Sequence, residues 1–202
     1  MKNGIEKYLF ATALLVMFFL SGCAMHIKMN QSLNEVNIGD KHINARVGLF
    51  LDNTFSDYHW HGNNVAEMSK MDYELGAASK NLFLEAFMRL CTSVTLVNAE
   101  PPYVEPDKKD ITIVVKPAII GFSEDHSAIL RVANYTASIT YHVKVTGAQG
   151  ETLIDRDYTG TGVAKGEATY SPASNYAAAA EKAMTAALSA IIGDIVQRNV
   201  GG

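Results

Sequence analysis

The chain has 202 residues, of which 48% are hydrophobic, and its 17 basic and 21 acidic residues give a net charge of −4. This length suits a single domain with a sizeable core. The charge balance argues against a nucleic-acid-binding protein. The sole basic doublet, Lys108-Lys109, is flanked by Asp107 and Asp110, and no Lys/Arg cluster is present to neutralise a run of phosphates.

The N-terminal segment has the order of a secretory signal. Lys2 and Lys7 give a positive start, residues 8–20 are almost wholly apolar, and two small residues then precede Cys23. The apolar run has 13 residues, whereas a membrane-spanning helix needs roughly 20. We therefore predict a cleaved signal peptide over residues 1–22, which leaves 15 basic and 20 acidic residues and a net charge of −5.

The four residues Leu20-Ser21-Gly22-Cys23 resemble the lipobox of bacterial lipoproteins. In that family the cysteine is diacylated, the peptide before it is removed, and the new N-terminus is acylated. Several acyl chains hold a protein on a bilayer for long times, because each buried CH2 contributes about 0.8 kcal/mol. Since Ala24 rather than aspartate follows the cysteine, the resemblance implies an outer-membrane lipoprotein attached through Cys23.

Two alternatives to this arrangement stay open at the level of sequence. The domain would most simply face the periplasm, but display on the cell surface is also compatible with the anchor. A plain signal peptide with a chance cysteine at its boundary is the other alternative. The second cysteine, Cys91, has no protein partner once Cys23 is acylated, so we expect a buried, inert thiol rather than a disulfide.

Residues 23–44 are predicted to be a lipidated N-terminus and a flexible tether, because they show neither a period of two nor a sustained apolar stripe. Residues 45–200 are predicted to form one periplasmic domain. A compact apolar run predicts a first strand over 45–53, and residues 54–66, rich in aromatic, His, Gly and Asn residues, are predicted to be a loop.

A helix followed by a strand is predicted next. Apolar residues at spacings of three and four run from Met71 to Leu90, and residues 93–97 form a short β-type run. A strand, a helix and a strand connected this tightly predict a right-handed crossover with parallel strands.

The second half of the chain predicts a three-stranded meander. Residues 110–122 alternate until Pro117, which marks a strand edge or a bulge. The odd positions from 129 to 145 are mostly apolar and the even positions mostly polar, so one face of a long strand is covered and the other meets water. Residues 147–151 turn the chain and 152–165 return as a strand.

The last predicted element is a helix of about two dozen residues that starts at Ser171-Pro172, with Ser174 as an alternative cap. The element order favours an α+β fold, a two-layer sandwich in which two helices pack on one face of a mixed sheet of about five strands.

The loop "DYHWHGNN" is the one candidate for a ligand site. Asp57, His59 and His61 offer two imidazoles and a carboxylate to zinc or copper, and Trp60 could stack on a ligand or contact a partner. His-x-His alone is a weak signal and no spacing rule places a third histidine. The favoured interpretation is therefore an exposed aromatic loop without a metal or cofactor, and a small-ligand or metal-binding module is kept as the alternative.

No catalytic motif is found, so we do not expect an enzyme. The sequence has no G-x-S-x-G elbow and no glycine-rich loop between a strand and a helix start. If the odd positions of the long strand face the helices, its even positions form a polar strip on the open face of the sheet, available to a partner. These residues are Thr136, Ser138, Thr140, His142 and Lys144.

The overall pattern resembles small bacterial envelope lipoproteins of the YajG and LptE type and, more distantly, the periplasmic domain of the curli-export lipoprotein. The resemblance depends on the lipobox, on residues 72–97 as a helix leading to a strand, on residues 110–122, and on the long strand before a final helix. It implies a non-catalytic accessory, assembly or protein-interaction role at the outer membrane, with an envelope protein as partner.

Overall fold

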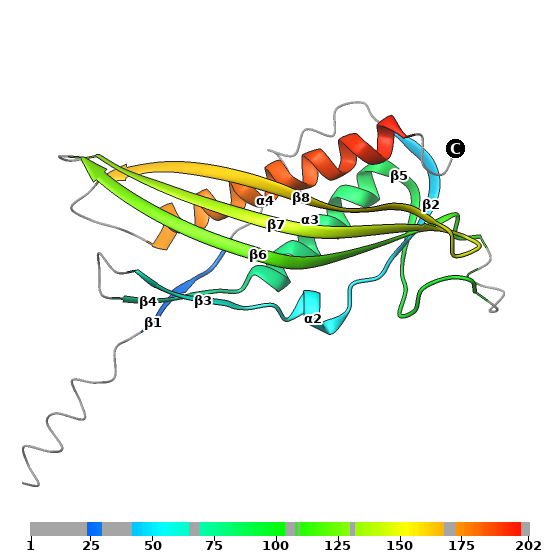
Figure 1. Ribbon diagram of the computed structural model, residues 1–202, viewed down its shortest axis with the longest axis horizontal. Coiled ribbons are helices and arrows are strands. Elements are labelled where there is room, and N and C mark those ends of the chain that lie inside the picture. The colour runs from blue at the N-terminus through cyan, green and yellow to red at the C-terminus, as the bar shows by residue number, and fades with distance from the viewer. Residues whose placement is uncertain are drawn as a thin grey trace, which may run out of the picture.

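The computed structural model of the chain describes residues 24–29, 42–64, 69–103, 108, 110–129, 132–167 and 173–198. The predicted signal peptide, the lipobox with Cys23, most of the predicted tether and the predicted helix start at Ser171-Pro172 lie outside the described residues. Figure 1 labels the elements, which in chain order are β1 (Ala24–Ile27), β2 (Ile43–Leu49), α2 (Asn53–Ser56), β3 (Trp60–Asn64), β4 (Ser69–Tyr73), α3 (Leu75–Leu90), β5 (Cys91–Leu96), β6 (Ile113–Ile129), β7 (Val132–Gly147), β8 (Thr152–Glu167) and α4 (Ala173–Gln197).

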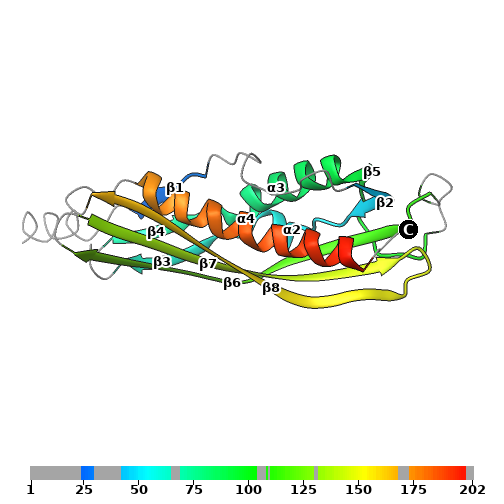
Figure 2. The ribbon, with the colours of Figure 1, turned by 90° about the horizontal axis from the view of Figure 1, so that it is seen from above.

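The main layer is a mixed five-stranded sheet in the order β5-β2-β6-β7-β8. β2 runs parallel to β5 and β6, whereas β6, β7 and β8 form an antiparallel meander. The two long helices, α3 and α4, lie on the same side of this sheet (Figure 2). The predicted α+β sandwich, the parallel crossover and the meander are therefore confirmed. Among the helices of the described residues, none combines the length and apolarity needed to span a membrane.

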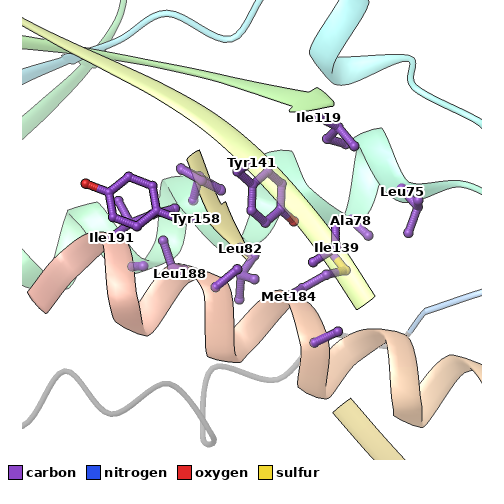
Figure 3. Packing of buried hydrophobic residues seen from close by; sticks show 14 of the residues in the cluster. Leu75, Ala78, Leu82, Ile119, Ile139, Tyr141, Tyr158, Met184, Leu188 and Ile191 are labelled. Carbon is purple, nitrogen blue, oxygen red and sulfur yellow. The ribbon is translucent and has the colours of Figure 1, made fainter. Parts of the chain in front are cut away.

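The period-two pattern of β7 fixes which face of the sheet is buried. Every odd-numbered residue from Ala133 to Val145 is at most 1% exposed, while the even positions from 134 to 144 are half-buried on the other face. Figure 3 shows Ile139 and Tyr141 of β7 among side chains of α3 and α4, including Leu82 and Met184. The buried Tyr141 hydroxyl shares a hydrogen bond of 2.7 Å with Ser79 of α3, which satisfies both polar groups in the core. Ile129, predicted to open this strand, belongs to β6 instead.

Two glycines allow α4 to lie directly on β8. A Cβ at Gly160 would come within 2.0 Å of the Ala183 carbonyl oxygen, and one at Gly162 within 2.1 Å of the Ala179 carbonyl oxygen. The contact is therefore backbone against backbone, and the small side chains of the alanine-rich helix make it possible.

Pro117 occupies a free edge of β6. β2 pairs only with residues 113–115 of β6, so that beyond Val115 no strand of the described residues pairs with this side of β6. A proline without an N–H is tolerated there, and the pairing with β7 is irregular shortly after it, between Ile119 and Gly121. The predicted edge position is confirmed.

A second sheet was not predicted. β1, β4 and β3 form a three-stranded sheet, with β1 parallel and β3 antiparallel to β4. The prediction of a tether was therefore wrong for residues 24–27, where Ile27 is 1% exposed and part of the core. It was also wrong for residues 43–44, which begin β2.

The predicted loop over 54–66 was also wrong. The strand predicted over 45–53 ends at Leu49, and Asp52 caps α2 by accepting a hydrogen bond of 2.9 Å from the Phe55 N–H. β3 then occupies the second half of the segment.

The predicted helix was too long at its start, because Met71 lies in β4 and α3 begins at Leu75. Met71 fits a helical spacing with Leu75, but it also alternates with Asp72 and Tyr73, and the pairing of β4 on both sides decides in favour of the strand. At the other end of α3, Cys91 is buried, and burial raises the pKa of its thiol to about 12. The prediction of a buried thiol is confirmed.

One substitution pair tests the register of β7. Ile139→Asp would bury an unpaired carboxylate among the helices and is expected to cost more than about 3 kcal/mol, enough to unfold the domain. Thr140→Asp, one residue later on the half-buried outer face, is expected to change the free energy of unfolding by less than about 1 kcal/mol. Thermal melting measures both, and the reverse order of stability would contradict the register.

The attachment of the α4 C-terminus to β8 gives a pH-dependent prediction. Asp194 accepts hydrogen bonds from the Tyr158 hydroxyl (2.6 Å) and from Arg198 Nε (2.8 Å). The Tyr158 bond, opposed by burial and assisted by Arg198, holds the pKa of the Asp194 carboxyl below its ordinary value.

Asp194→Asn is therefore expected to lower the free energy of unfolding by about 1 kcal/mol at pH 7. Because the folded-state pKa is below the unfolded value of about 3.9, this contribution is present above pH about 5 and is lost as pH falls through the folded-state pKa. Urea unfolding of both proteins at pH 7 and pH 3 measures the difference. A difference that does not shrink toward pH 3 would contradict the assignment.

Candidate functional site

The outer face of the small sheet carries a row of ionisable side chains. In the pairing of the three strands, Asp72 of β4 lies opposite His26 of β1 on one side and opposite His61 of β3 on the other. Directly opposed residues in neighbouring strands have Cβ atoms roughly 5 Å apart. The pairing of β4 with its neighbour in the chain, β3, and with the distant β1 therefore brings a carboxylate and two imidazoles into one row.

The strands have this orientation because each alternates apolar and polar residues. Met25 and Ile27, Met71 and Tyr73, and Trp60 pack toward the core, which leaves His26, Asp72 and His61 on the outer face. His59 comes directly before β3, and the carbonyl of the preceding Tyr58 accepts a hydrogen bond of 2.8 Å from the Gly76 N–H at the start of α3. This hydrogen bond to α3 thus fixes the backbone next to His59.

Three imidazole rings converge on the Asp72 carboxylate. His59 Nδ1 lies 3.2 Å and His61 Nδ1 3.3 Å from the same oxygen, Oδ1. His26 Nδ1 lies 2.9 Å from the other oxygen, Oδ2. The rings of His59 and His61 are stacked, with centroids 6.1 Å apart and planes inclined by 21°. We call these four residues the His–Asp cluster.

The carboxylate of the cluster is covered while its imidazoles meet solvent. The side chain of Asp72 is 11% exposed, against 63% for His26, 45% for His59 and 73% for His61. Burial acts to raise the pKa of the Asp72 carboxyl. The hydrogen bond from His59, the potential of His61 and the hydrogen bond from His26 outweigh it, so that the pKa lies below its ordinary value. Asp72 is therefore ionised at neutral pH.

A packed aromatic layer supports the cluster from below. Trp60 makes edge contacts with Tyr73 (centroids 5.5 Å apart) and with Phe122 of β6 (5.1 Å), and Tyr73 contacts Phe122 (4.9 Å). The Trp60 ring lies over Gly62, where a Cβ would come within 1.9 Å of it. Glycine is thus the residue that lets the indole lie flat against β3 and attach the small sheet to the main one.

Two of the four residues of the His–Asp cluster were predicted from the sequence. His59 and His61 are brought together as the motif suggested, but Asp57 is exposed at the C-terminal end of α2, and Asp72 takes its place as the carboxylate. His26 was assigned to the tether and was missed. A depression of about 310 Å³ adjoins the cluster, lined by Ala24, His61, Gly62, Asn63, Lys70, Met71 and Asp72.

Another histidine, His142, lies between two carboxylates on the open face of the main sheet, with a different geometry. His142 Nδ1 is 2.8 Å from Asp157, and its Nε2 is 3.1 Å from Asp155. The two carboxylates bind opposite edges of one ring, so they orient the imidazole but do not converge on a common point. His142 is thus held in place by its neighbours on β8.

The predicted partner strip lies where the sequence placed it. Thr136, Ser138, Thr140 and His142 are half-buried on the face of β7 opposite the helices. Thr140 shares a hydrogen bond of 2.9 Å with Thr159 of β8. Toward the β2 end the same face becomes charged, because Glu100 accepts hydrogen bonds from Lys116 (2.8 Å) and Lys144 (2.7 Å).

The likeness of the chain to known proteins lies in its fold. No family model and no curated protein matches it. It is similar to protein XCC0632 from Xanthomonas campestris, of the family model DUF330, with a TM-score of 0.55 and 10% identity over 87% of this chain and 96% of that one. Two further similar structures have lower TM-scores. A homolog of the neuraminyllactose-binding hemagglutinin from Helicobacter pylori gives 0.47 (11% identity, 87% and 94% covered), and the hypothetical protein CT253 from Chlamydia trachomatis gives 0.40 (12%, 78% and 96%). The likeness to XCC0632 shows a shared fold at very low identity.

Proposed function

We propose that the protein is a lipid-anchored lipoprotein of the outer membrane with a non-catalytic, protein-binding role in the cell envelope. The observation that carries this proposal is the position of the lipobox relative to the fold. Cys23 directly precedes Ala24, the first residue of β1, so the acylated residue would be attached to a strand of the folded domain.

This attachment differs from the arrangement predicted from the sequence, in which some 20 residues separate the lipid from the domain. Consecutive Cα atoms are about 3.8 Å apart, and β1 is paired with β4 from Ala24 onward. An acylated Cys23 would therefore hold the small sheet at the bilayer surface. Figure 1 shows β1 and β4 toward the end of the molecule at which β6 meets β7, and the β7–β8 turn at the opposite end.

The role in protein binding is supported by the open face of the meander. Both long helices lie on the opposite face of the sheet, and the open face presents the hydroxyl groups of Thr136, Ser138 and Thr140. Short hydroxyl side chains offer hydrogen bonds at little cost in side-chain entropy. An anchored domain with its long axis leading away from the bilayer presents this face to a protein in the periplasm.

The anchor is tested by metabolic labelling with radioactive palmitate. The full chain should incorporate label, Cys23→Ala should not, and Cys91→Ala should label like the parent because its thiol is buried. Equal labelling of the parent and Cys23→Ala would refute the lipid anchor.

The orientation is tested by placing a fluorophore on Asn63→Cys and measuring quenching by lipids that carry a nitroxide on the headgroup. Asn63 is exposed. It pairs with Lys70 of β4, which in turn pairs with Ala24 of β1, so Asn63 lies two strands, or roughly 10 Å, from Ala24. We expect strong quenching there and little at Gln149→Cys, an exposed position in the β7–β8 turn. A flexible ten-residue insertion between Cys23 and Ala24 should abolish the difference. Equal quenching at the two positions without the insertion would contradict the orientation but not the anchor.

A further inference from the structure

We propose that His59, His61 and Asp72 bind one divalent transition-metal ion, zinc by preference, and that His26 orients the carboxylate from its second oxygen. None of its ligands comes from Cys23 or from the open face of β7, so the site can be tested without the lipid anchor and without a partner. It uses one ligand atom from each of three residues, and these atoms all lie within 4.8 Å of one another.

The distances fit a tetrahedral ion with little rearrangement. Zinc binds imidazole nitrogen and carboxylate oxygen at about 2.0–2.2 Å, which puts neighbouring ligand atoms of a tetrahedron roughly 3.3–3.5 Å apart. Asp72 Oδ1 is already 3.2 Å from His59 Nδ1 and 3.3 Å from His61 Nδ1. The remaining distance, between the ligand nitrogens of His59 and His61, is no more than 4.8 Å. Small rotations of these two exposed rings would shorten it to the tetrahedral value.

The charge of the cluster also favours a cation. Three imidazole nitrogens point at one carboxylate, and two of them point at the same oxygen. A neutral imidazole has one N–H and one lone pair, so His59 and His61 can each turn a lone pair toward an ion, and the Asp72 carboxylate supplies the negative charge that attracts it. A metal ion between Oδ1 and the two nitrogens satisfies all three groups at once.

His26 has the position of an orienting residue. Its Nδ1 lies 2.9 Å from Oδ2, so an N–H donated to that oxygen would turn Oδ1 toward His59 and His61. Outer partners of this kind fix metal-binding carboxylates and tune the affinity of the site. The strand pairing that holds His26 opposite Asp72 makes this contact part of the fold.

The donor set limits the choice of ion. Two imidazole nitrogens and one carboxylate oxygen suit zinc and copper better than calcium or magnesium, which prefer oxygen ligands alone. Three protein ligands leave a fourth position open to water at a solvent-exposed site. The Lys70 side chain adjoins the same depression, but it is exposed, and salt screens its charge.

The test is a titration of the full chain, purified in detergent, with Zn²⁺ by isothermal calorimetry. We expect one ion per chain. His61→Ala, which removes the most exposed ring and so spares the fold, should weaken binding by at least about tenfold, and His26→Ala by about 10- to 100-fold. His142→Ala is the matched control, because its ring also contacts carboxylates but on opposite edges, and it should bind as the parent does.

Two further measurements make the result specific. Trp60, the single tryptophan of the chain, lies beside His59 and His61, so bound Cu²⁺ should quench its fluorescence in the parent and His142→Ala but far less in His61→Ala. Cys23→Ala should bind Zn²⁺ like the parent, because no ligand comes from the anchor. Unchanged affinity in His61→Ala, a loss in His142→Ala, or no Zn²⁺ binding by a parent that melts cooperatively would each overturn the proposal.

Discussion

The burial of one complete face of β7 is the constraint on which the rest of the molecule depends. The meander is long, and the inward side chains of β7 are buried along its whole length. A sheet with one apolar face must be covered from end to end. α4 covers the β8 side at backbone distance over Gly160 and Gly162, and α3 contributes the Ser79 hydrogen bond to Tyr141. The aromatic surface around Phe122 of β6 remains to be considered.

The small sheet covers that remaining surface. Trp60 and Tyr73 pack on Phe122 of β6, and Met71 and Ile27 complete the same layer of the core. Because strands alternate, the residues next to these buried ones must point away from the core. His61, Asp72 and His26 are those residues. The His–Asp cluster is therefore a consequence of the way in which the small sheet closes the core. Strand pairing places His26, Asp72 and His61, and the hydrogen bond between Tyr58 and Gly76 of α3 holds the backbone next to His59.

The elements that sequence predicts well are those whose pattern repeats many times. The alternation from residue 132 to 146 and the helical stripe from Leu75 to Leu90 each contain several repeats, so the register of β7 and the core face of α3 follow directly. β1 and β3 have four and five residues, too few for a period to stand out from chance. Their pairing also depends on β4, which is more than 40 residues after β1 in the chain.

The same limit explains why half of the cluster was missed. His59 and His61 are close in the sequence, and their spacing is visible there, whereas Asp72 and His26 join them only through cross-strand register. A local rule therefore chose Asp57, the nearest carboxylate along the chain. The signal that was available is the alternation of Met25, His26 and Ile27 and of Met71, Asp72 and Tyr73, with a polar residue between two apolar ones in each case.

The two proposals meet at β1. This strand pairs with β4 along one side and is an edge of the small sheet, so its attachment depends on four residues of parallel pairing, on Ile27 in the core and on His26 at the cluster. Edge strands of this length are the first to separate when a fold opens locally. A ligand that binds only the closed arrangement stabilises it by mass action. A metal ion on Asp72, held in orientation by His26, would strengthen the one strand that connects the domain to Cys23. With the ion bound, the small sheet of an acylated protein would therefore remain in contact with the bilayer surface.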